Sequence, residues 1–418
     1  MHEQAYNAQC RAEEKRHPPQ SPTQKRDALI LFSLALGTFA IGSGEFGSNG
    51  IVQLFAADLD ASVPTATNAI TAYALGVVIG SPALTIAAAR LNRRTLLLGL
   101  VGLFIVGNLL SAAASDLGVL VVARFITGTV QGAFFGAGAV VAAYTYGPGK
   151  GGKAFATVMA GLTIATIFGA PVGTFIGQQV GWQALYLVVS MVGLLAGAAI
   201  WVFVPRTSAL AGGSIMQELG ALRRPMVWAT MAIAALGISS IFAVYTFIGP
   251  YITDAVAVDE AWIPVALAVF GVGMALGNWV GGHLADRFEY RGLILGYAVV
   301  LVFLAIIAVG GENLGVLLPC LLGVGASTMM AIPTIQVLLT RYAPEAPTLM
   351  GAVNLASLNL ANALGAIGGA LVLNAGWGPL STAWAGLALT AAGLLLFAVT
   401  VPRVAPPQPL TASMSATA

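Results

Sequence analysis

The chain has 418 residues, of which 58% are hydrophobic and only 8% are charged, whereas about 25% of the residues in a soluble domain are charged. Its net charge is +2 and its mean hydropathy is +0.88. This composition excludes a soluble globular protein, a disordered chain and a secreted disulfide scaffold. It predicts an all-α polytopic membrane protein. A spanning helix needs about 20 residues, so the length suits roughly a dozen spans.

Polar tails flank the apolar part of the chain. Residues 1–27 are polar, and no small-residue cleavage site follows the first apolar run closely. We therefore expect a disordered cytoplasmic tail ahead of a retained first span rather than a secretory signal. Residues 402–418 are rich in Pro, Ser and Thr and are also predicted to form a disordered cytoplasmic tail.

Twelve apolar segments between the tails predict transmembrane helices, because lipid offers no hydrogen-bond partners to backbone groups. The segments are continuously apolar, which excludes the alternating pattern of a β-barrel. The predicted spans cover residues 28–50, 66–88, 95–115, 118–145, 154–178, 182–204, 227–250, 262–285, 292–310, 314–338, 349–373 and 379–401.

The basic residues support this division. Seventeen of the 18 Lys and Arg residues fall in the tails and in every second loop, and the opposite loops contain acidic residues such as Asp58 and Asp259. Basic loops stay on the cytoplasmic side of a membrane. The pattern therefore predicts a multi-pass protein of the cytoplasmic (inner) membrane with both termini in the cytoplasm.

The sequence repeats itself with an offset of about 196 residues. Arg90 recurs as Arg287 at an offset of 197, and Gly169 recurs as Gly365 at 196. Two halves in the same orientation are the parallel repeat of many secondary transporters, which place their binding site between the halves. A repeat that builds only a scaffold is the alternative. The predicted units are an N-terminal six-helix bundle (28–204), a cytoplasmic linker (205–225) and a C-terminal six-helix bundle (226–401).

Two charged residues fall inside predicted spans, Glu45 in the first and Arg124 in the fourth. An ionised carboxylate in hydrocarbon is costly, so Glu45 is a candidate to bind and release protons. Its alternative role is a structural hydrogen bond near the end of the span. Arg124 keeps its charge and either biases a nearby acid or ties helices together. No second carboxylate lies within a span of the first half, which favours Glu45 as the proton carrier.

Several uncharged polar side chains also fall inside apolar spans. Some of them are expected to line a central substrate cavity, although hydrogen bonding between helices is the more common use of such groups. These low-specificity cavity candidates are Tyr245, Asn278, Gln336, Asn359 and Asn362.

Glycine-rich motifs lie at the ends of the eighth and second spans. Residues 277–287 read Gly-Asn-Trp-Val-Gly-Gly-His-Leu-Ala-Asp-Arg, and the first-half copy over 80–94 has Ala89 where the Asp is expected. Span one reads Gly-Glu-Phe over 44–46, and span four begins a motif at Arg124 with Arg-Phe-Ile-Thr-Gly. Span five carries a fifth set of small residues, namely Gly161, Gly169, Pro171, Gly173 and Gly177.

In their joint order these motifs resemble the major facilitator superfamily. Within it the chain looks like the twelve-span drug:proton antiporter family, on the branch of arabinose- and sugar-efflux-like permeases and chloramphenicol exporters. The resemblance covers residues 28–401. It identifies the span-five set as the antiporter motif, expected to form a close, kinked contact between the halves, with generic small-residue packing as the alternative. It also implies a gating role for Asp286, Arg287, Arg90, Gly277 and Gly281.

The leading interpretation is a secondary transporter that exports a small neutral or amphipathic molecule, drug-like or sugar-like, by proton antiport and alternating access. A proton-coupled or facilitated importer of a small metabolite is the alternative. A channel would need a ring of like charges or re-entrant loops. An enzyme or ATP-driven pump would need a zinc helix, a nucleophile elbow or a phosphate loop. We therefore expect no enzyme activity, no cofactor and no metal. The expected partners are the lipid bilayer, protons and a small-molecule substrate, and no nucleic acid. We expect the protein to be a monomer.

Overall fold

The computed structural model describes residues 22–88, 90–147, 151–207, 210, 218–288, 290–344 and 346–401. Within these residues, twelve helices are long and apolar enough to cross a membrane, so the predicted number of spans is confirmed. The predicted tails lie outside the described residues for 1–21 and 402–418, as does much of the linker predicted over 205–225.

The first half contains six spans, three of which are divided into shorter helices. They are α2 (Pro22–Gly50); α4 (Val63–Ala66), α5 (Asn68–Leu75), η1 (Gly76–Gly80) and α6 (Ser81–Ala87); α7 (Arg93–Ala112); α8 (Leu117–Gly128) and α9 (Gln131–Tyr146); α10 (Gly151–Ile164), η2 (Ala165–Gly169) and α11 (Ala170–Val180); and α12 (Gln183–Phe203). The short α3 (Val52–Asp58) follows α2.

The second half also contains six spans, which follow η4 (Glu218–Arg223). Its spans are α13 (Pro225–Tyr245), continued by α14 (Ile248–Pro250) and η5 (Tyr251–Ala255); α15 (Trp262–Phe288); α16 (Arg291–Gly310); α17 (Leu314–Met329) and α18 (Ala331–Tyr342); α19 (Pro347–Asn374); and α20 (Ser381–Thr400).

Most predicted helix ends agree with the structure to within a few residues. Two differ more clearly. Helix α2 begins at Pro22, inside the segment predicted as a tail, because nothing in residues 22–27 stops a helix once the apolar run has nucleated it. Helix α13 ends at Tyr245, before the predicted end at residue 250, and α14 and η5 carry the chain on to Ala255.

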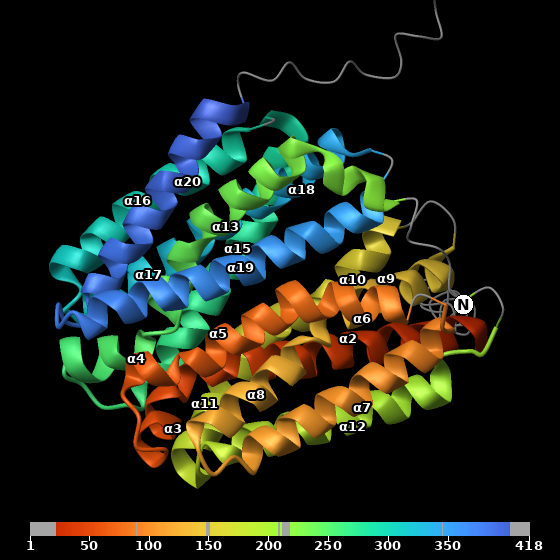
Figure 1. Ribbon diagram of the computed structural model, residues 1–418, viewed down its shortest axis with the longest axis horizontal. Coiled ribbons are helices and arrows are strands. Elements are labelled where there is room, and N and C mark those ends of the chain that lie inside the picture. The colour runs from red at the N-terminus through yellow and green to blue at the C-terminus, as the bar shows by residue number, and fades with distance from the viewer. Residues whose placement is uncertain are drawn as a thin grey trace, which may run out of the picture.

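Two bundles lie against each other, one coloured red to yellow-green and the other green to blue (Figure 1). The same glycine contacts hold corresponding helices together in each bundle. A Cβ atom at these glycines would overlap the backbone or side chain of the neighbouring helix, so the helices approach each other closely only because Gly stands there. The contacts are Gly76 with Phe125 and Gly80 with Thr129 in the first half, and Gly273 with Leu322 and Gly277 with Ala326 in the second.

Each member of the second-half contacts lies 197 residues after its first-half counterpart. The internal repeat predicted from the sequence is therefore also a repeat of helix packing. It relates the second span to the eighth and the fourth to the tenth, which confirms two pseudo-equivalent six-helix halves.

The loops at the two ends of the molecule differ in charge. We call one the acidic end, which has Asp58, Asp60, Asp116, Asp254, Asp259, Glu260 and Glu312. The other is the basic end, which has Arg90, Arg206, Arg223, Arg224, Arg291 and Arg341.

The most extensive contacts between the halves involve two pairs of spans. The second span (α4, α5 and η1) packs against α19, as Figure 1 shows for α5, and the fifth span (η2 and α11) packs against α15. On one face of α15, Leu267 and Gly271 are buried, whereas Asn278, seven residues nearer the basic end, is exposed. The interface on α15 is therefore covered toward the acidic end and accessible toward the basic end.

Candidate functional site

Glu45 lies on α2 and is only 4% exposed. The side-chain amide of Gln131, at the start of α9, donates a hydrogen bond of 2.8 Å to Glu45 Oε2. Asn362 on α19, in the other half, lies beside the same carboxylate, although neither polar atom of its amide completes a hydrogen bond with a described residue. The acid is therefore held by its own half and faced by the other.

Arg124 lies on α8 and is 1% exposed. Its guanidinium carbon stands 4.3 Å from the centre of the Tyr73 ring and 5.4 Å from that of Tyr186. Its Nη2 donates to the carbonyl oxygen of Gly44 at 3.2 Å, next to Glu45 in the chain. This bond links α8 to α2, which is the geometry that a helix-tying role needs. The guanidinium also acts electrostatically on the Glu45 carboxylate, as a biasing role requires, but it bonds to the backbone.

Tyr245, at the end of α13, supplies the aromatic wall of this site from the second half. Its ring lies edge-on to Phe46, with the centres 5.8 Å apart, and to Phe270, with the centres 5.1 Å apart. The Tyr245 hydroxyl feels the charge of Glu45 and has no hydrogen-bond partner in the described part of the chain.

Unpartnered polar atoms gather around Glu45. Leaving a buried donor or acceptor without a partner costs about 1–3 kcal/mol, so such atoms are rare unless a ligand, ion or water takes them. Several helices contribute one here, which indicates a place that binds something polar. Glu45 and the atoms around it form what we call the central polar cluster. The other members are Tyr73 Oη, Arg124 Nε and Nη1, Gln131 Oε1, Tyr245 Oη and both polar amide atoms of Asn362. Among the described residues these atoms have no hydrogen-bond partner, whereas Glu45 accepts a bond from Gln131.

The remaining cavity candidates lie at different distances from this cluster. Asn359 is 1% exposed and donates to Leu355 O at 3.1 Å, one turn before Asn362. Gln336 accepts a hydrogen bond of 2.9 Å from Asn354 within the second half. Asn278 is exposed on the accessible part of α15. The structure thus brings Tyr245 and Asn362 to Glu45, and it leaves Gln336 and Asn278 nearer the basic end.

The predicted gating residues are only partly described. Gly277 and Gly281 are buried against the backbone of Ala326 and Met330, so they hold the eighth and tenth spans together. Arg90 is exposed at the basic end. The side chains of Asp286 and Arg287, and Ala89 as a whole, lie outside the described residues.

The glycines of the antiporter motif have partners other than those expected. Each faces α2, α12 or the short segments beside them, all in the first half, so their predicted contact between the halves is wrong. Helical spacing identifies the shared face but not the helix that covers it. Their nearest neighbours are Ala35 for Gly161, Ser43 for Gly169, Leu185 for Gly173 and Ile51 for Gly177.

A different part of the fifth span touches the second half. A Cβ atom at Gly271 on α15 would overlap the carbonyl of Thr166 in η2. The five-residue π-helical turn η2 ends at Gly169, two residues before Pro171, and both features are known causes of helix bending. The expected irregularity of this span is therefore present, and Thr166 rather than a motif glycine meets the other half.

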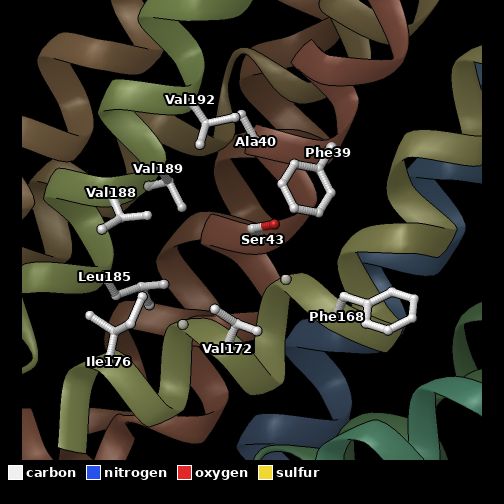
Figure 2. Close-up of a pocket in the computed structure, with 12 residues that line it drawn as sticks. Phe39, Ala40, Ser43, Phe168, Val172, Ile176, Leu185, Val188, Val189 and Val192 are labelled. Carbon is white, nitrogen blue, oxygen red and sulfur yellow. The ribbon is translucent and has the colours of Figure 1, made fainter. Parts of the chain in front are cut away.

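The antiporter motif also borders an apolar pocket of about 130 Å³. Figure 2 shows the pocket between α2, α12 and the span of η2 and α11, with Ser43 as the single side-chain hydroxyl. Phe168 on its rim is 62% exposed, so the pocket belongs to the outer, apolar surface of the bundle. The lining residues are Phe39, Ala40, Ser43, Phe168, Gly169, Val172, Gly173, Ile176, Leu185, Val188, Val189 and Val192.

Two members of the central polar cluster were missed at the sequence level. Gln131 follows Arg124 by seven residues, which is two helical turns and the same helix face, so its position held a usable signal. Tyr73 gave none, because an isolated Tyr in an apolar span is common and its partner, Arg124, is 51 residues away.

The chain resembles known transporters along most of its length. A family model described as the Major Facilitator Superfamily matches residues 34–366. The "Inner membrane transport protein YdhP" of Escherichia coli (strain K12) is 36% identical over 350 residues, which cover 83% of this chain and 90% of that protein. The "Chloramphenicol resistance protein" of Streptomyces lividans is 31% identical over 349 residues, covering 82% and 89%.

A solved structure shows the same fold. It is the crystal structure of a bacterial homologue of the human lysosomal transporter Spinster, which matches with a TM-score of 0.66 and 14% identity over 90% of this chain and 95% of that one. The fold, the twelve candidate spans and the relatives agree with the resemblance that the motifs gave. The chain belongs to the major facilitator superfamily and is a multi-pass membrane transporter, not an enzyme.

Proposed function

We propose that this transporter exports a small neutral or amphipathic molecule in exchange for protons. The observation that carries the proposal is the placement of Glu45. It is the one carboxylate well inside a candidate span, and it lies among unpartnered polar atoms where the two halves meet. A carboxylate in such a place changes charge each time it meets water, and intramembrane acids commonly serve as proton relays.

Coupling follows from the two openings of the transporter. When the basic end admits water, Glu45 releases its proton, and Arg124 stabilises the carboxylate that forms. When the acidic end opens to a more acidic medium, Glu45 takes up a proton again. Substrate leaves as the proton enters, so the proton gradient drives export. Because both halves contribute to one site, a single chain is sufficient, and we propose that the protein acts as a monomer.

The cluster also bears on the substrate. One carboxylate and one guanidinium balance each other, so the site has no net charge with which to select an ion. Aromatic rings stand beside hydrogen-bonding groups, which suits a neutral or amphipathic molecule, drug-like or sugar-like. The name of the Streptomyces lividans relative supports export of a drug-like substrate over import of a metabolite.

A flux measurement tests the proposal. Purified protein in proteoliposomes with an imposed pH gradient should concentrate a substrate found by a thermal-shift screen of phenicols, neutral drugs and sugars. Glu45→Gln, which mimics the protonated acid, should keep downhill exchange but lose concentration against a gradient, and Glu45→Asp should retain part of it. Glu312→Gln at the acidic end is the matched control. If Glu45→Gln concentrates substrate as well as the parent does, another group carries the proton. If protons and substrate cross the membrane in the same direction, the protein is an importer.

The direction of transport also depends on orientation. We propose that the basic end is cytoplasmic, because cytoplasmic loops are enriched in Lys and Arg. Single cysteines at positions 58 and 259 should react with an impermeant maleimide added outside intact cells, and a cysteine at position 150 should react only after permeabilisation. Labelling of 150 alone in intact cells would reverse the orientation.

A further inference from the structure

A row of polar side chains runs from Glu45 toward the acidic end. Asn49 and Gln53 follow Glu45 at intervals of four residues, so they lie one and two turns further along the same side of α2 and its continuation α3. Neither belongs to the central polar cluster. Both reach across to the second half of the molecule.

The first crossing joins α2 to the end of α13. Thr246 Oγ1 donates to Asn49 Oδ1 at 2.9 Å, and both residues are at most 1% exposed. The amide nitrogen of Asn49 donates to Glu45 O at 3.2 Å and to Phe46 O at 3.4 Å. Asn49 is therefore fastened to the turn that bears Glu45, and only its oxygen is free to hold the other half.

The second crossing lies one turn closer to the acidic end. Gln53 Nε2 donates to Thr253 Oγ1 in η5 at 3.0 Å. A Cβ atom at Gly249 in α14 would collide with the Gln53 amide, so glycine at this position makes room for the side chain. Close packing continues beside the row, where a Cβ atom at Gly50 would lie 2.7 Å from Cδ1 of Leu267 on α15.

From this geometry we infer that the Asn49–Thr246 and Gln53–Thr253 pairs are the gate that closes the acidic end of the transporter. Both pairs cross between the halves, they stack directly beyond the central polar cluster, and every member is uncharged. Neutral hydrogen bonds suit a gate that opens in each cycle, because each is worth little net free energy once water replaces the partner. The inference requires only that the transporter alternates between two openings, and it holds whichever group carries the proton.

The test measures the distance between the halves at the acidic end. Spin labels are attached at Ala57→Cys and Glu260→Cys, two exposed positions in opposite halves, after Cys10 and Cys320 have been replaced. Double electron–electron resonance in nanodiscs then measures the distance between the two labels, which increases when the acidic end opens. Thr246→Val with Thr253→Val removes the two hydroxyls while keeping side-chain shape. Each lost bond should raise the open-to-closed ratio about 2- to 10-fold, so the longer-distance population should grow.

The control removes an equally buried bond within one half. Tyr251 and Thr382 share a hydrogen bond of 2.7 Å, and Thr382→Val should leave the distance distribution as in the parent. The single variant Asn49→Ala serves as a second, independent break of the row and should act in the same direction as the double variant. The inference is wrong if Asn49→Ala and the folded double variant both show the same distance distribution as Thr382→Val. The two pairs would then be ordinary packing contacts, and the gate would lie elsewhere.

Discussion

The two halves of the molecule use the same helix contacts for different chemistry. Gly76 against Phe125 in the first half recurs as Gly273 against Leu322 in the second, 197 residues later. At that same offset the second half has no counterpart of the charged side chains of the central polar cluster. Arg124 corresponds to Leu321, Gln131 to Thr328 and Tyr73 to Phe270, and all three second-half residues are fully buried.

This difference separates two demands on the sequence. Close helix approach needs glycine wherever two spans cross, so both halves keep it. Ionisable groups are costly in the membrane, and one set is sufficient for a site that both halves share. The first half therefore holds the charged groups, and the second half contributes neutral partners such as Tyr245 and Asn362. Variants that make one half resemble the other test this division directly.

The largest effect is expected when the first half takes the residue of the second. Arg124→Leu places at α8 the residue found at the equivalent position of α17. Coupled transport should fall by about 100-fold, equivalent to about 3 kcal/mol, because the ionised form of Glu45 loses its compensating charge. The unfolding temperature should fall, since removing one member of a buried pair of opposite charges leaves the other charge uncompensated.

Flux in proteoliposomes and thermal unfolding are measured on the same preparations. Arg206→Leu, which removes the same charge from an exposed site at the basic end, is the control and should transport normally. Undiminished flux in Arg124→Leu would show that the asymmetry between the halves has no role in transport.

A smaller effect is expected at the basic ends of the second and eighth spans. The second-half copy has Asp286 and the first-half copy has Ala89. Asp286→Asn should slow transport by about tenfold, the order expected when the end of a helix loses one charge. Ala89→Asp, which restores the pattern in the first half, should change the rate by less. Equal losses at equal expression would show that both sites gate transport alike.

The sequence predicted the parts of this molecule in which desolvation dominates. Twelve spans follow from the cost of unpaired backbone in lipid, and Glu45 and Arg124 stood out because charge is rare there. Contacts between distant spans were beyond reach. Asn49 and Thr246 are 197 residues apart, so they occupy equivalent positions of the repeat, but the repeat does not tell which equivalent residues touch each other. The antiporter glycines show the same limit, since their spacing revealed a common face but not the helices covering it.

The shared glycine contacts should themselves differ in tolerance. A Cβ atom at Gly277 would meet only the backbone of Ala326, whereas one at Gly80 would meet the side chain of Thr129 first. A side chain can turn aside and a backbone cannot, so Gly277→Ala should destabilise the protein by about 1–3 kcal/mol, as overpacking does. Gly80→Ala should cost less. Thermal unfolding of both variants beside the parent measures the difference, and a larger loss for Gly80→Ala would contradict it.

The smallest difference concerns two serines in equivalent positions. Ser43 faces Gly169 and Ser239 faces Gly365, each member of the second pair lying 196 residues after the first. Ser239 Oγ donates to Ala235 O at 2.5 Å, whereas Ser43 Oγ, seen beside the apolar pocket in Figure 2, has no partner among the residues that the structure describes. A buried hydroxyl without a partner opposes folding, and a bonded one supports it.

The same substitution should therefore act in opposite directions in the two halves. Ser43→Ala removes an unsatisfied group and should stabilise the protein by up to about 1 kcal/mol, while Ser239→Ala should destabilise it by about 0.5–1.5 kcal/mol. Neither serine belongs to the central polar cluster, so flux should stay near that of the parent, and the effect should be visible in thermal unfolding alone. If Ser43→Ala lowers the unfolding temperature as much as Ser239→Ala does, the Ser43 hydroxyl makes a hydrogen bond in the membrane-embedded protein.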